Sequence, residues 1–384
     1  MVLGVLGVLG GLLVALSAVG VVYWLAAATF VRRTLAGRTP VLSEPVPVTI
    51  LKPLHGAEPG LADNLASFAR QDYGGATQIV CGVQDPADPA RAVAEALART
   101  ATEAGGPEVD VVVDPVLHGQ NRKISNLINM MGRVRHQTLV LSDADIAARP
   151  DYLARVIAAL SDPAVGLVTC YYYGQGQAGF WSRFAAMGIS YGFMPNVVVG
   201  VTLGMATPCM GSTIAIRRDL LAEIGGFEAF ADRLADDYEI GAAVRALGYR
   251  TVLPDFAVAH GCAESSLSEV IAHEMRWAVT IRGISRSGHL GSIVTHATPC
   301  AFIGTVLLGA PTFALAALLA AIAARYWLAL SVDRSVGAKS GDWWLLPLRD
   351  FVSFGVFTCS LFARSVDWRG QRLRVSSRGE LSAA

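Results

Sequence analysis

An unbroken run of uncharged, mostly apolar residues at the start of the chain most restricts what this sequence can fold into. Residues 1–31 contain no charged side chain, and Arg32 and Arg33 follow directly. A helix of this length spans a hydrocarbon layer of about 30 Å with residues to spare. A cleaved signal peptide is the competing interpretation, because the alanines at 26–28 resemble a cleavage site. The run is too long for one and lacks a basic leader, so we favour an N-terminal membrane anchor.

Two further apolar stretches near the other end of the chain extend the membrane prediction. Residues 297–324 carry no charge, whereas residues 343–363 contain Arg349 and Asp350. Charges are costly within a hydrocarbon layer, so we expect this pair near an interface or paired within a helix bundle. The pattern predicts a C-terminal membrane region over residues 291–365, with two spans.

Arginines beside these stretches predict which side of the membrane each end faces. Arg32, Arg33 and Arg38 follow the first stretch, and residues 366–384 form a basic tail. Basic residues favour the cytoplasmic side of a membrane. We therefore expect the tail, and the residues between the anchor and the C-terminal spans, to be cytoplasmic.

A fourth uncharged stretch, residues 184–216, leaves two interpretations open. It contains Pro195, Asn196 and five glycines, which do not suit a simple span. A span here would also separate acidic motifs that lie on either side of it. Either the stretch faces the membrane, lying on its surface or lining a groove, or it is buried core of a soluble domain.

Composition narrows the class of protein further. Only 16% of the residues are charged, against about 25% in ordinary soluble domains. A chain this apolar has enough surface to bury on folding, which excludes intrinsic disorder. The 31 basic and 31 acidic residues balance, so no nucleic acid partner is expected. The six cysteines are far apart and the seven histidines form no metal-binding pair, which argues against a structural zinc site.

Residues 45–290 alternate between short apolar runs and helical patterns. Apolar runs without period-two alternation, separated by helices, predict an α/β domain with a mostly parallel sheet covered on both faces. The expected strands are 46–51, 78–83, 109–113, 138–141 and 165–169, and the expected helices are 61–70, 88–104, 121–133 and 151–160. Ligands of such sheets bind at the carboxyl ends of the strands. Neither a dinucleotide-binding glycine motif nor a P-loop occurs in the sequence.

Acidic residues lie just past three of these strands. The third strand along the chain ends at Asp110 to Asp114. Asp85 follows the second strand, and Asp143 and Asp145 follow the fourth, where alternation puts both carboxylates on one side. Two close carboxylates repel each other unless a cation lies between them. Mg²⁺ binds one or two carboxylates together with phosphate oxygens, which favours a diphosphate ligand here.

Three other segments carry charges that suggest chemistry. Asn121 suits a helix N-cap, but Lys123 in the first turn opposes the helix dipole, which a phosphate ligand would explain. Asp236 and Asp237 precede a helical pattern, where they are either dipole-favoured acids or a general base for an incoming hydroxyl. Arg276 and Trp277 suit a pyrophosphate contact beside an aromatic platform, or equally a membrane-interface anchor.

Six short motifs occur in an order that resembles the ceramide glucosyltransferase family, whose members are inverting glycosyltransferases of the family 21 and family 2 type. They are KPLHG from residue 52, VQDPADPA from 83, GQNRKISNL from 119, SDADI from 142, LADDYE from 234 and HEMRW from 273. The resemblance covers nearly the whole chain, including the apolar ends. It is strongest to a bacterial branch associated with hopanoid biosynthesis.

The resemblance implies a cytoplasmic catalytic domain with the Rossmann-like GT-A fold, which uses a UDP-sugar and Mg²⁺ or Mn²⁺. Asp143 and Asp145 are then the metal and diphosphate ligands. The residues expected at the nucleotide-sugar are Pro53, Asp85, Lys123, Asp143 and Arg276.

The same resemblance implies a catalytic set. Asp237 is the expected catalytic base, with Arg276 and Trp277 contributing to catalysis and Asp236 beside the base. The family's last motif begins with glutamine or arginine, whereas this chain has His273, which puts the role of that position in doubt.

The expected reaction is the transfer of a sugar from a UDP-sugar to a hydroxyl of a lipid in the bilayer, forming a β-glycoside. UDP-N-acetylglucosamine is favoured over UDP-glucose, and a hopanoid polyol such as bacteriohopanetetrol is the favoured acceptor. The alternatives are a ceramide glucosyltransferase, a polyprenyl-phosphate sugar transferase, and, from another class, a membrane scaffold or small transporter. The expected location is the bacterial inner membrane, with several spans.

Overall fold

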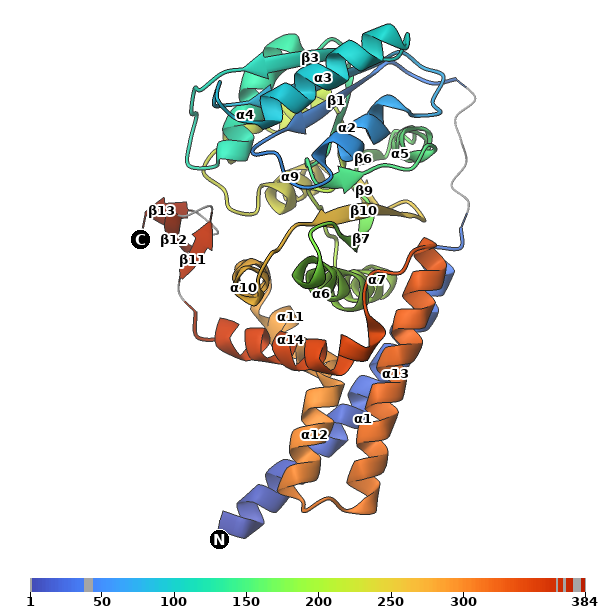
Figure 1. Cartoon of the computed structure of the whole chain (residues 1–384), viewed down its shortest axis with the longest axis vertical. Helices are drawn as coiled ribbons and strands as arrows, with labels where there is room; N and C mark the ends of the chain where they lie inside the picture. Colours follow the sequence, from blue (N-terminus) through green and yellow to red (C-terminus); the bar gives the residue numbers. More distant parts are fainter. Residues whose placement is uncertain (1, 38–43, 364, 369–370, 376–380, 384) are drawn as a thin grey trace. The chain divides into compact units, whose positions relative to one another are not determined.

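The computed structural model divides the chain into two compact units (Figure 1). It describes residues 2–37, 44–363, 365–368, 371–375 and 381–383. Unit 1 comprises Met1–Ala36, Gly174–Leu203 and Glu264–Ala384, and unit 2 comprises Gly37–Tyr173 and Gly204–Ala263. Unit 2 therefore contains the strands and helices expected up to residue 169, whereas residues 174–203 and 264–290 of the domain predicted over 45–290 belong to unit 1 with the apolar helices.

A seven-stranded sheet with the order β3-β2-β1-β4-β8-β6-β9 forms the centre of unit 2. The first four strands in that order are parallel, β8 is antiparallel to both of its neighbours, and β9 is parallel to β6. The strands are β1 Val48–Pro53, β2 Thr77–Val83, β3 Glu108–Val113, β4 Thr138–Leu141, β6 Val165–Val168, β8 Ile214–Arg217 and β9 Arg250–Val252. The predicted mostly parallel sheet is confirmed.

Helices cover both faces of this sheet. Alternate strand residues such as Leu51 and Leu141 face one apolar cluster with α4, α8 and α9. On the opposite face Phe68 of α2 packs edge-on against Tyr152 of α5. The helices are α2 Leu61–Ala69, α3 Ala90–Glu103, α4 Arg122–Met130, α5 Tyr152–Leu160, α8 Arg218–Glu223 and α9 Asp236–Ala246, with short 3-10 turns at Met131–Arg133 and Phe227–Phe230.

A smaller sheet has the strand order β5-β10-β7. Its strands are β5 Ile146–Ala147, β10 Ala257–Cys262 and β7 Tyr171–Gly176. In the antiparallel pairing of β10 with β5, His260 lies opposite Ile146. This pairing brings the middle of β10 to the residues that follow β4.

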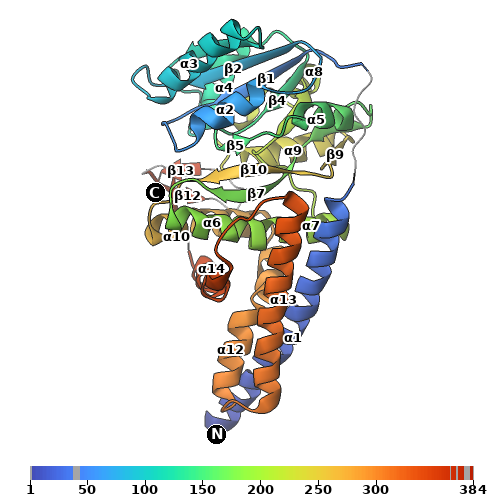
Figure 2. The ribbon, with the colours of Figure 1, turned by 45° about the vertical axis from the view of Figure 1, so that its right-hand side comes forward.

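Three helices of unit 1 run side by side as a bundle (Figures 1 and 2). They are α1 Val2–Thr34, α12 Ala297–Leu307 and α13 Thr312–Val336. The backbones of α1 and α12 touch, because a Cβ added to Gly304 would lie 2.8 Å from the carbonyl oxygen of Gly10. Such close approach between apolar helices depends on small residues. Of these helices, α1 and α13 are long and apolar enough to cross a membrane.

The apolar run 297–324 is divided where one span was expected. α12 ends at Leu307 and α13 begins at Thr312, after a turn in which Gly309 and Ala310 have φ angles of 75° and 59°. Pro311 then caps α13, which continues well beyond the run to Val336. The sequence G-A-P breaks the helix because proline disfavours a helical residue before it. The helical segment Arg286–Thr295 comes just before α12, and the two are bent by 64° relative to each other.

A second set of helices in unit 1, α6, α10 and α14, lies across the direction of this bundle. They are α6 Phe180–Gly188, α10 Leu267–Ile284 and α14 Leu346–Ser360. Figures 1 and 2 both show them lying across the direction of α13. α6 continues through a π-helical turn, Ile189–Phe193, into α7 Met194–Thr202. The remaining elements are α11 Arg286–Gly291, 3-10 turns at Ser292–Thr295 and Trp343–Leu345, and strands β11 Ser365–Trp368, β12 Gln371–Val375 and β13 Leu381–Ala383.

The stretch 184–216 is thus divided between the units, so neither earlier interpretation covers all of it, and a membrane-facing role of its first part stays a prediction. Residues up to 202 form apolar helices in unit 1, and Phe180–Thr202 passes a length-and-composition test for a span although two thirds of its tested window is buried. The last residues form β8, whose Ile214 and Ile216 are buried in the core of unit 2.

The charges inside the C-terminal apolar stretch are paired within unit 1. Arg325 of α13 donates from Nη2 to Asp350 Oδ1 at 2.8 Å and from Nη1 to the Tyr191 carbonyl oxygen at 2.6 Å. Thr298 donates to the same carboxylate at 2.9 Å. Arg349 forms an ion pair with Glu274. The buried Arg325–Asp350 pair therefore joins α12, α13, α14 and the π-helical turn.

Candidate active site

The carboxyl ends of neighbouring parallel strands carry several of the predicted site residues. Pro53 ends β1, and the segment from Ser142 to Asp145 follows β4, which pairs with β1. Asp85 follows β2 on the other side of β1, where it is exposed and accepts the Ala87 N–H at 2.8 Å. The sheet order therefore places Pro53, Asp85 and the D-x-D segment along one edge.

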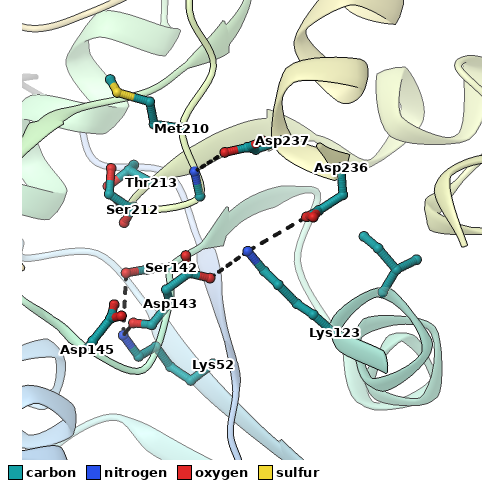
Figure 3. A network of polar contacts seen from close by, with 12 residues as sticks. Lys52, Lys123, Ser142, Asp143, Asp145, Met210, Ser212, Thr213, Asp236 and Asp237 are labelled. Atoms are coloured by element: carbon teal, nitrogen blue, oxygen red, sulfur yellow. Dashed lines mark hydrogen bonds and ion pairs between the residues drawn. The ribbon is translucent and has the colours of Figure 1, made fainter. Parts of the chain in front are cut away.

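Lys123 lies between two of the predicted acidic residues (Figure 3). Its Nζ is 2.6 Å from Asp143 Oδ1 and 3.7 Å from Asp236 Oδ2. Burial by itself would lower the pKa of Lys123, but the carboxylates of Asp143, Asp236 and Asp237 outweigh it and raise that pKa above its ordinary value. Lys123 is therefore a permanent cation among carboxylates.

Asn121 holds the start of α4 against the loop that carries Asp236. As the N-cap of α4, its Oδ1 accepts the Ile124 N–H at 3.1 Å, as predicted. Its Nδ2 donates to the Arg233 carbonyl oxygen at 2.9 Å and to Asp236 Oδ1 at 3.2 Å. One asparagine side chain thus joins the GQNRK and LADDYE motifs.

Asp237 is held by hydrogen bonds to both carboxylate oxygens. Gly211 N–H donates to Oδ2 at 2.9 Å, and Tyr238 N–H donates to Oδ1 at 2.8 Å. Burial and the neighbouring Asp236 carboxylate nevertheless raise the pKa of Asp237 to about 6. The carboxylate is thus fixed in orientation and can accept a proton near neutral pH.

Gly211 connects Asp237 to the D-x-D segment. Its N–H binds Asp237, and its carbonyl oxygen accepts the Asp143 N–H at 3.3 Å. A Cβ at this position would lie 2.6 Å from Asp143 Oδ2 and 2.8 Å from Lys123 Nζ. Only glycine at position 211 therefore leaves room for the ion pair between Lys123 and Asp143, which lies close to this part of the backbone.

Lys52, in the first motif, is a fully buried lysine on β1. Its Nζ donates to the Asp143 carbonyl oxygen at 2.6 Å and to Ser142 Oγ at 3.3 Å, and lies 3.8 Å from the centre of the Phe68 ring. Burial lowers the pKa of Lys52 to about 7, against the opposing effect of Asp145 and Asp143. Lys52 therefore fixes the backbone of the turn that carries the two aspartates.

Asp145 has an oxygen suited to a cation. Its Oδ1 is buried without a hydrogen-bond partner, while its Oδ2 is 3.3 Å from His260 Nε2. In the described part of the chain, no three His, Cys, Asp or Glu side chains are grouped so as to hold a metal alone. Two carboxylates completed by phosphate oxygens still match the preference of Mg²⁺, so Asp143 and Asp145 fit a divalent ion that arrives with a diphosphate.

His273, Arg276 and Trp277 lie on α10, in unit 1. His273 Nδ1 is 2.6 Å from Glu264 Oε1, and its ring packs edge-on against Trp277 with centroids 4.6 Å apart. Trp277 also contacts Phe193 of the π-helical turn, at 5.4 Å between centroids. The catalytic and donor-binding roles assigned to Arg276 and Trp277 stay predictions.

Two residues of the site were not singled out from the sequence. Lys52 belongs to a quoted motif, but only its complete burial reveals its contact with the D-x-D turn. His260 lies within an apolar strand, and a lone histidine there usually belongs to the core. Its position beside Asp145 depends on the pairing of β10 with β5, for which the sequence gives no signal.

Comparison with known proteins finds relatives in sequence and in structure. A ceramide glucosyltransferase of Caenorhabditis elegans is 23% identical over 87% of this chain and 72% of its own length. An N-acetylglucosaminyltransferase of Rhizobium leguminosarum bv. viciae is 25% identical over 64% of this chain and 59% of its own. A mannosyltransferase structure from Pyrobaculum calidifontis, in complex with GDP-Man and Mn²⁺, covers 92% of this chain and 99% of its own, with 21% identity and a TM-score of 0.49.

A family model extends the match to almost the whole chain. The sequence model of glycosyl transferase family 21 matches residues 12–381. This range includes the polar network of unit 2, the α10 motif and the helices of unit 1. The chain therefore belongs to glycosyl transferase family 21.

Proposed function

We propose that this glycosyltransferase transfers a sugar from a UDP-sugar to a hydroxyl group of a membrane lipid, with inversion at the anomeric carbon. The observation that carries the proposal is Asp237, fixed through Gly211 to the Lys123–Asp143 pair. A proton acceptor and a cation–carboxylate pair suited to a diphosphate are thereby joined through one backbone residue. This is the combination that a single displacement on a nucleotide-sugar requires.

In the proposed reaction, Asp237 accepts the proton of the acceptor hydroxyl as the oxygen attacks the anomeric carbon. The bond from that carbon to the diphosphate breaks, and UDP leaves with the electron pair. Lys123 donates to the departing diphosphate and neutralises part of its charge. An α-linked donor then yields a β-glycoside.

Asp143 and Asp145 would hold the divalent ion, with His260 beside Asp145 Oδ2. When bound, Mg²⁺ or Mn²⁺ supplies Lewis-acid stabilisation of negative charge on the diphosphate. Lys52 contributes by holding the Asp143 carbonyl oxygen, which keeps the turn between the two carboxylates in one conformation.

Replacing Lys52 with methionine is expected to weaken UDP-dependent Mn²⁺ binding by about 10–100-fold, the usual effect of losing a group that orients a metal ligand. Methionine keeps an unbranched side chain of similar length beside the Phe68 ring but cannot donate to the Asp143 carbonyl oxygen. Electron paramagnetic resonance of free Mn²⁺ during titration measures the effect. The matched control is Lys339→Met in unit 1, where the lysine is exposed; equal binding by both variants would contradict the role of Lys52.

For the substrates, we propose UDP-N-acetylglucosamine first and UDP-glucose next, with a hopanoid polyol such as bacteriohopanetetrol as acceptor and ceramide as the alternative. The relatives support both sugars, since one is a ceramide glucosyltransferase and another an N-acetylglucosaminyltransferase. The candidate membrane helices support an acceptor that stays in the bilayer. We propose that the catalytic unit lies on the cytoplasmic side of a bacterial inner membrane, because Arg32 and Arg33 lie in the last turn of α1.

The test is a transfer assay with the full-length protein in detergent. Mg²⁺ or Mn²⁺, both UDP-sugars and either a hopanoid polyol or ceramide are supplied, and products are identified by mass spectrometry. We expect one glycosylated lipid whose formation stops when the divalent ion is chelated. If the protein binds UDP and transfers to a polyprenyl phosphate but to neither lipid, the acceptor is a phosphate and not a lipid hydroxyl. Absence of UDP binding would overturn the site.

A further inference from the structure

The outward face of α14 is apolar although the helix contains charged residues. Together with the residues that flank it, this face exposes Trp344, Leu348 and Phe362, which are 71%, 55% and 79% exposed. Gly355 and Cys359 lie on the same face, at helical spacing, and are also exposed. The face carries no charge over its whole length.

The charges of α14 point the other way, into the protein. Arg349 and Asp350 are buried at 2% and 7% exposure. Arg349 donates from Nε to the Phe184 carbonyl oxygen at 3.0 Å and pairs with Glu274, while Asp350 pairs with Arg325. A helix that buries its charges and exposes its apolar side chains is arranged for contact with lipid rather than with water.

The length and direction of α14 do not suit a span. Its 15 residues rise about 22 Å, which is short of a hydrocarbon layer of about 30 Å. In both views it lies across α13, which is long and apolar enough to cross a membrane (Figures 1 and 2). If α13 crosses the bilayer, α14 lies close to the membrane plane.

The end of α14 continues into a second exposed apolar group. Arg282 of α10 donates to the carbonyl oxygens of Ser360 and Ala363, which joins the two helices at this point. Beyond it, Ile284 and Leu290 are exposed beside the exposed Arg286. Apolar side chains next to arginine are typical of segments that bind at the headgroup boundary of a bilayer.

We propose that α14 is an in-plane membrane helix, with Leu348, Cys359 and Phe362 at the boundary between headgroups and acyl chains. Lipid is the occupant because the face is uncharged and belongs to the same unit as the candidate spans. The apolar stretch 343–363 would then be a surface segment, in place of the second C-terminal span expected from its sequence.

Nitroxide depth measurements on the full-length protein in liposomes of phosphatidylcholine and phosphatidylglycerol test this proposal. Cys359 is exposed, whereas the other five cysteines are buried, so it can be labelled directly. Leu348→Cys and Gly355→Cys are labelled in a Cys359→Ser background, and a Cβ at Gly355 meets open space. Depth is obtained from the ratio of accessibility to oxygen and to a water-soluble nickel complex.

We expect all three labels at one shallow depth. Labels along the exposed side of α13, at Phe313, Leu319 and Trp327, provide the control and should differ in depth by up to about 20 Å. A label at the exposed Thr100 of unit 2 gives the value for water. A graded depth along α14 would make it a span, and accessibility equal to that at Thr100 would place it in water; either result overturns the proposal. Because no substrate is needed, failure of the proposed reaction would not affect this result.

Discussion

Replacement of Asp237 by asparagine is expected to lower kcat by about 10²–10⁴-fold, the usual contribution of a positioned general base. Asparagine can keep the Gly211 and Tyr238 hydrogen bonds through only one oxygen, and it cannot accept the acceptor's proton. UDP binding should remain within a few-fold of the parent, because the proposed role of Asp237 lies at the hydroxyl. Steady-state rates and calorimetric titration with UDP separate the two effects.

Glu239→Gln is the matched control for this variant, since it makes the same acid-to-amide change two residues further along α9. We expect its kcat within a factor of two of the parent. Near-normal turnover by Asp237→Asn would exclude the general-base role. A mild loss of turnover with polyprenyl phosphate as acceptor would instead favour the alternative transferase, because an acceptor that is already ionised needs no base.

The same carboxylate predicts the acid side of the pH profile. Because burial and Asp236 raise the pKa of Asp237 to about 6, the ionised, active form is lost as the pH falls through this value. We expect kcat/KM to be level above pH 7 and to fall about tenfold per pH unit below 5. The residual activity of Asp237→Asn should lack this acid limb.

Loss of Arg325 is expected to be the most destabilising single change in unit 1. In Arg325→Met, Asp350 stays buried with only the Thr298 hydroxyl as partner, and the Tyr191 carbonyl oxygen loses its donor. Breaking a buried ion pair on one side costs about 3–5 kcal/mol. The thermal unfolding midpoint should therefore fall by on the order of 10 °C. Intrinsic fluorescence during heating in detergent measures it.

The double variant Arg325→Met, Asp350→Leu distinguishes an unpaired charge from lost packing. Replacing both partners removes the buried charges together, so most of the lost stability should return. Arg183→Met provides the control, because Arg183 and Asp342 form an exposed pair at 3.2 Å, for which about 1 kcal/mol or less is expected. A double variant as unstable as Arg325→Met would show that the cost is packing against the Trp24 ring, 4.3 Å away.

The parallel part of the sheet follows closely from the sequence. β4 occupies the four residues expected, Thr138–Leu141, and the other expected strands differ by two residues or fewer. β1, β2, β4 and β6 are buried on both faces, so they appear as mainly apolar runs bounded by polar turns, whereas the edge strand β3 is only partly buried and contains Asp110. The D-x-D segment could be placed because it follows β4, and the Asn121 N-cap because asparagine precedes a helical pattern there.

The antiparallel strand and the boundaries of the apolar helices were not predictable in this way. β8 lies at the end of an uncharged stretch, where apolar helix and apolar strand share the same composition and only pairing with β4 and β6 separates them. The break at Gly309–Ala310–Pro311 did have a local signal, but it lies inside a run whose overall apolarity suggested one helix. Lys52 and His260 depend on contacts between segments distant in the chain.

The glycine contact between α1 and α12 has a consequence for how the protein is made. Gly10 and Gly304 touch in the bundle, yet roughly 300 residues separate them. At a synthesis rate of about 5–20 residues per second, α1 waits roughly 15–60 s for its partner. Throughout that time α1 must persist without α12, holding only contacts with earlier elements such as the hydrogen bond from Tyr23 to Asn196 of α7, while all of unit 2 is translated. A foreign leading helix could tether the nascent chain equally well, but it would not offer the matching groove when α12 arrives.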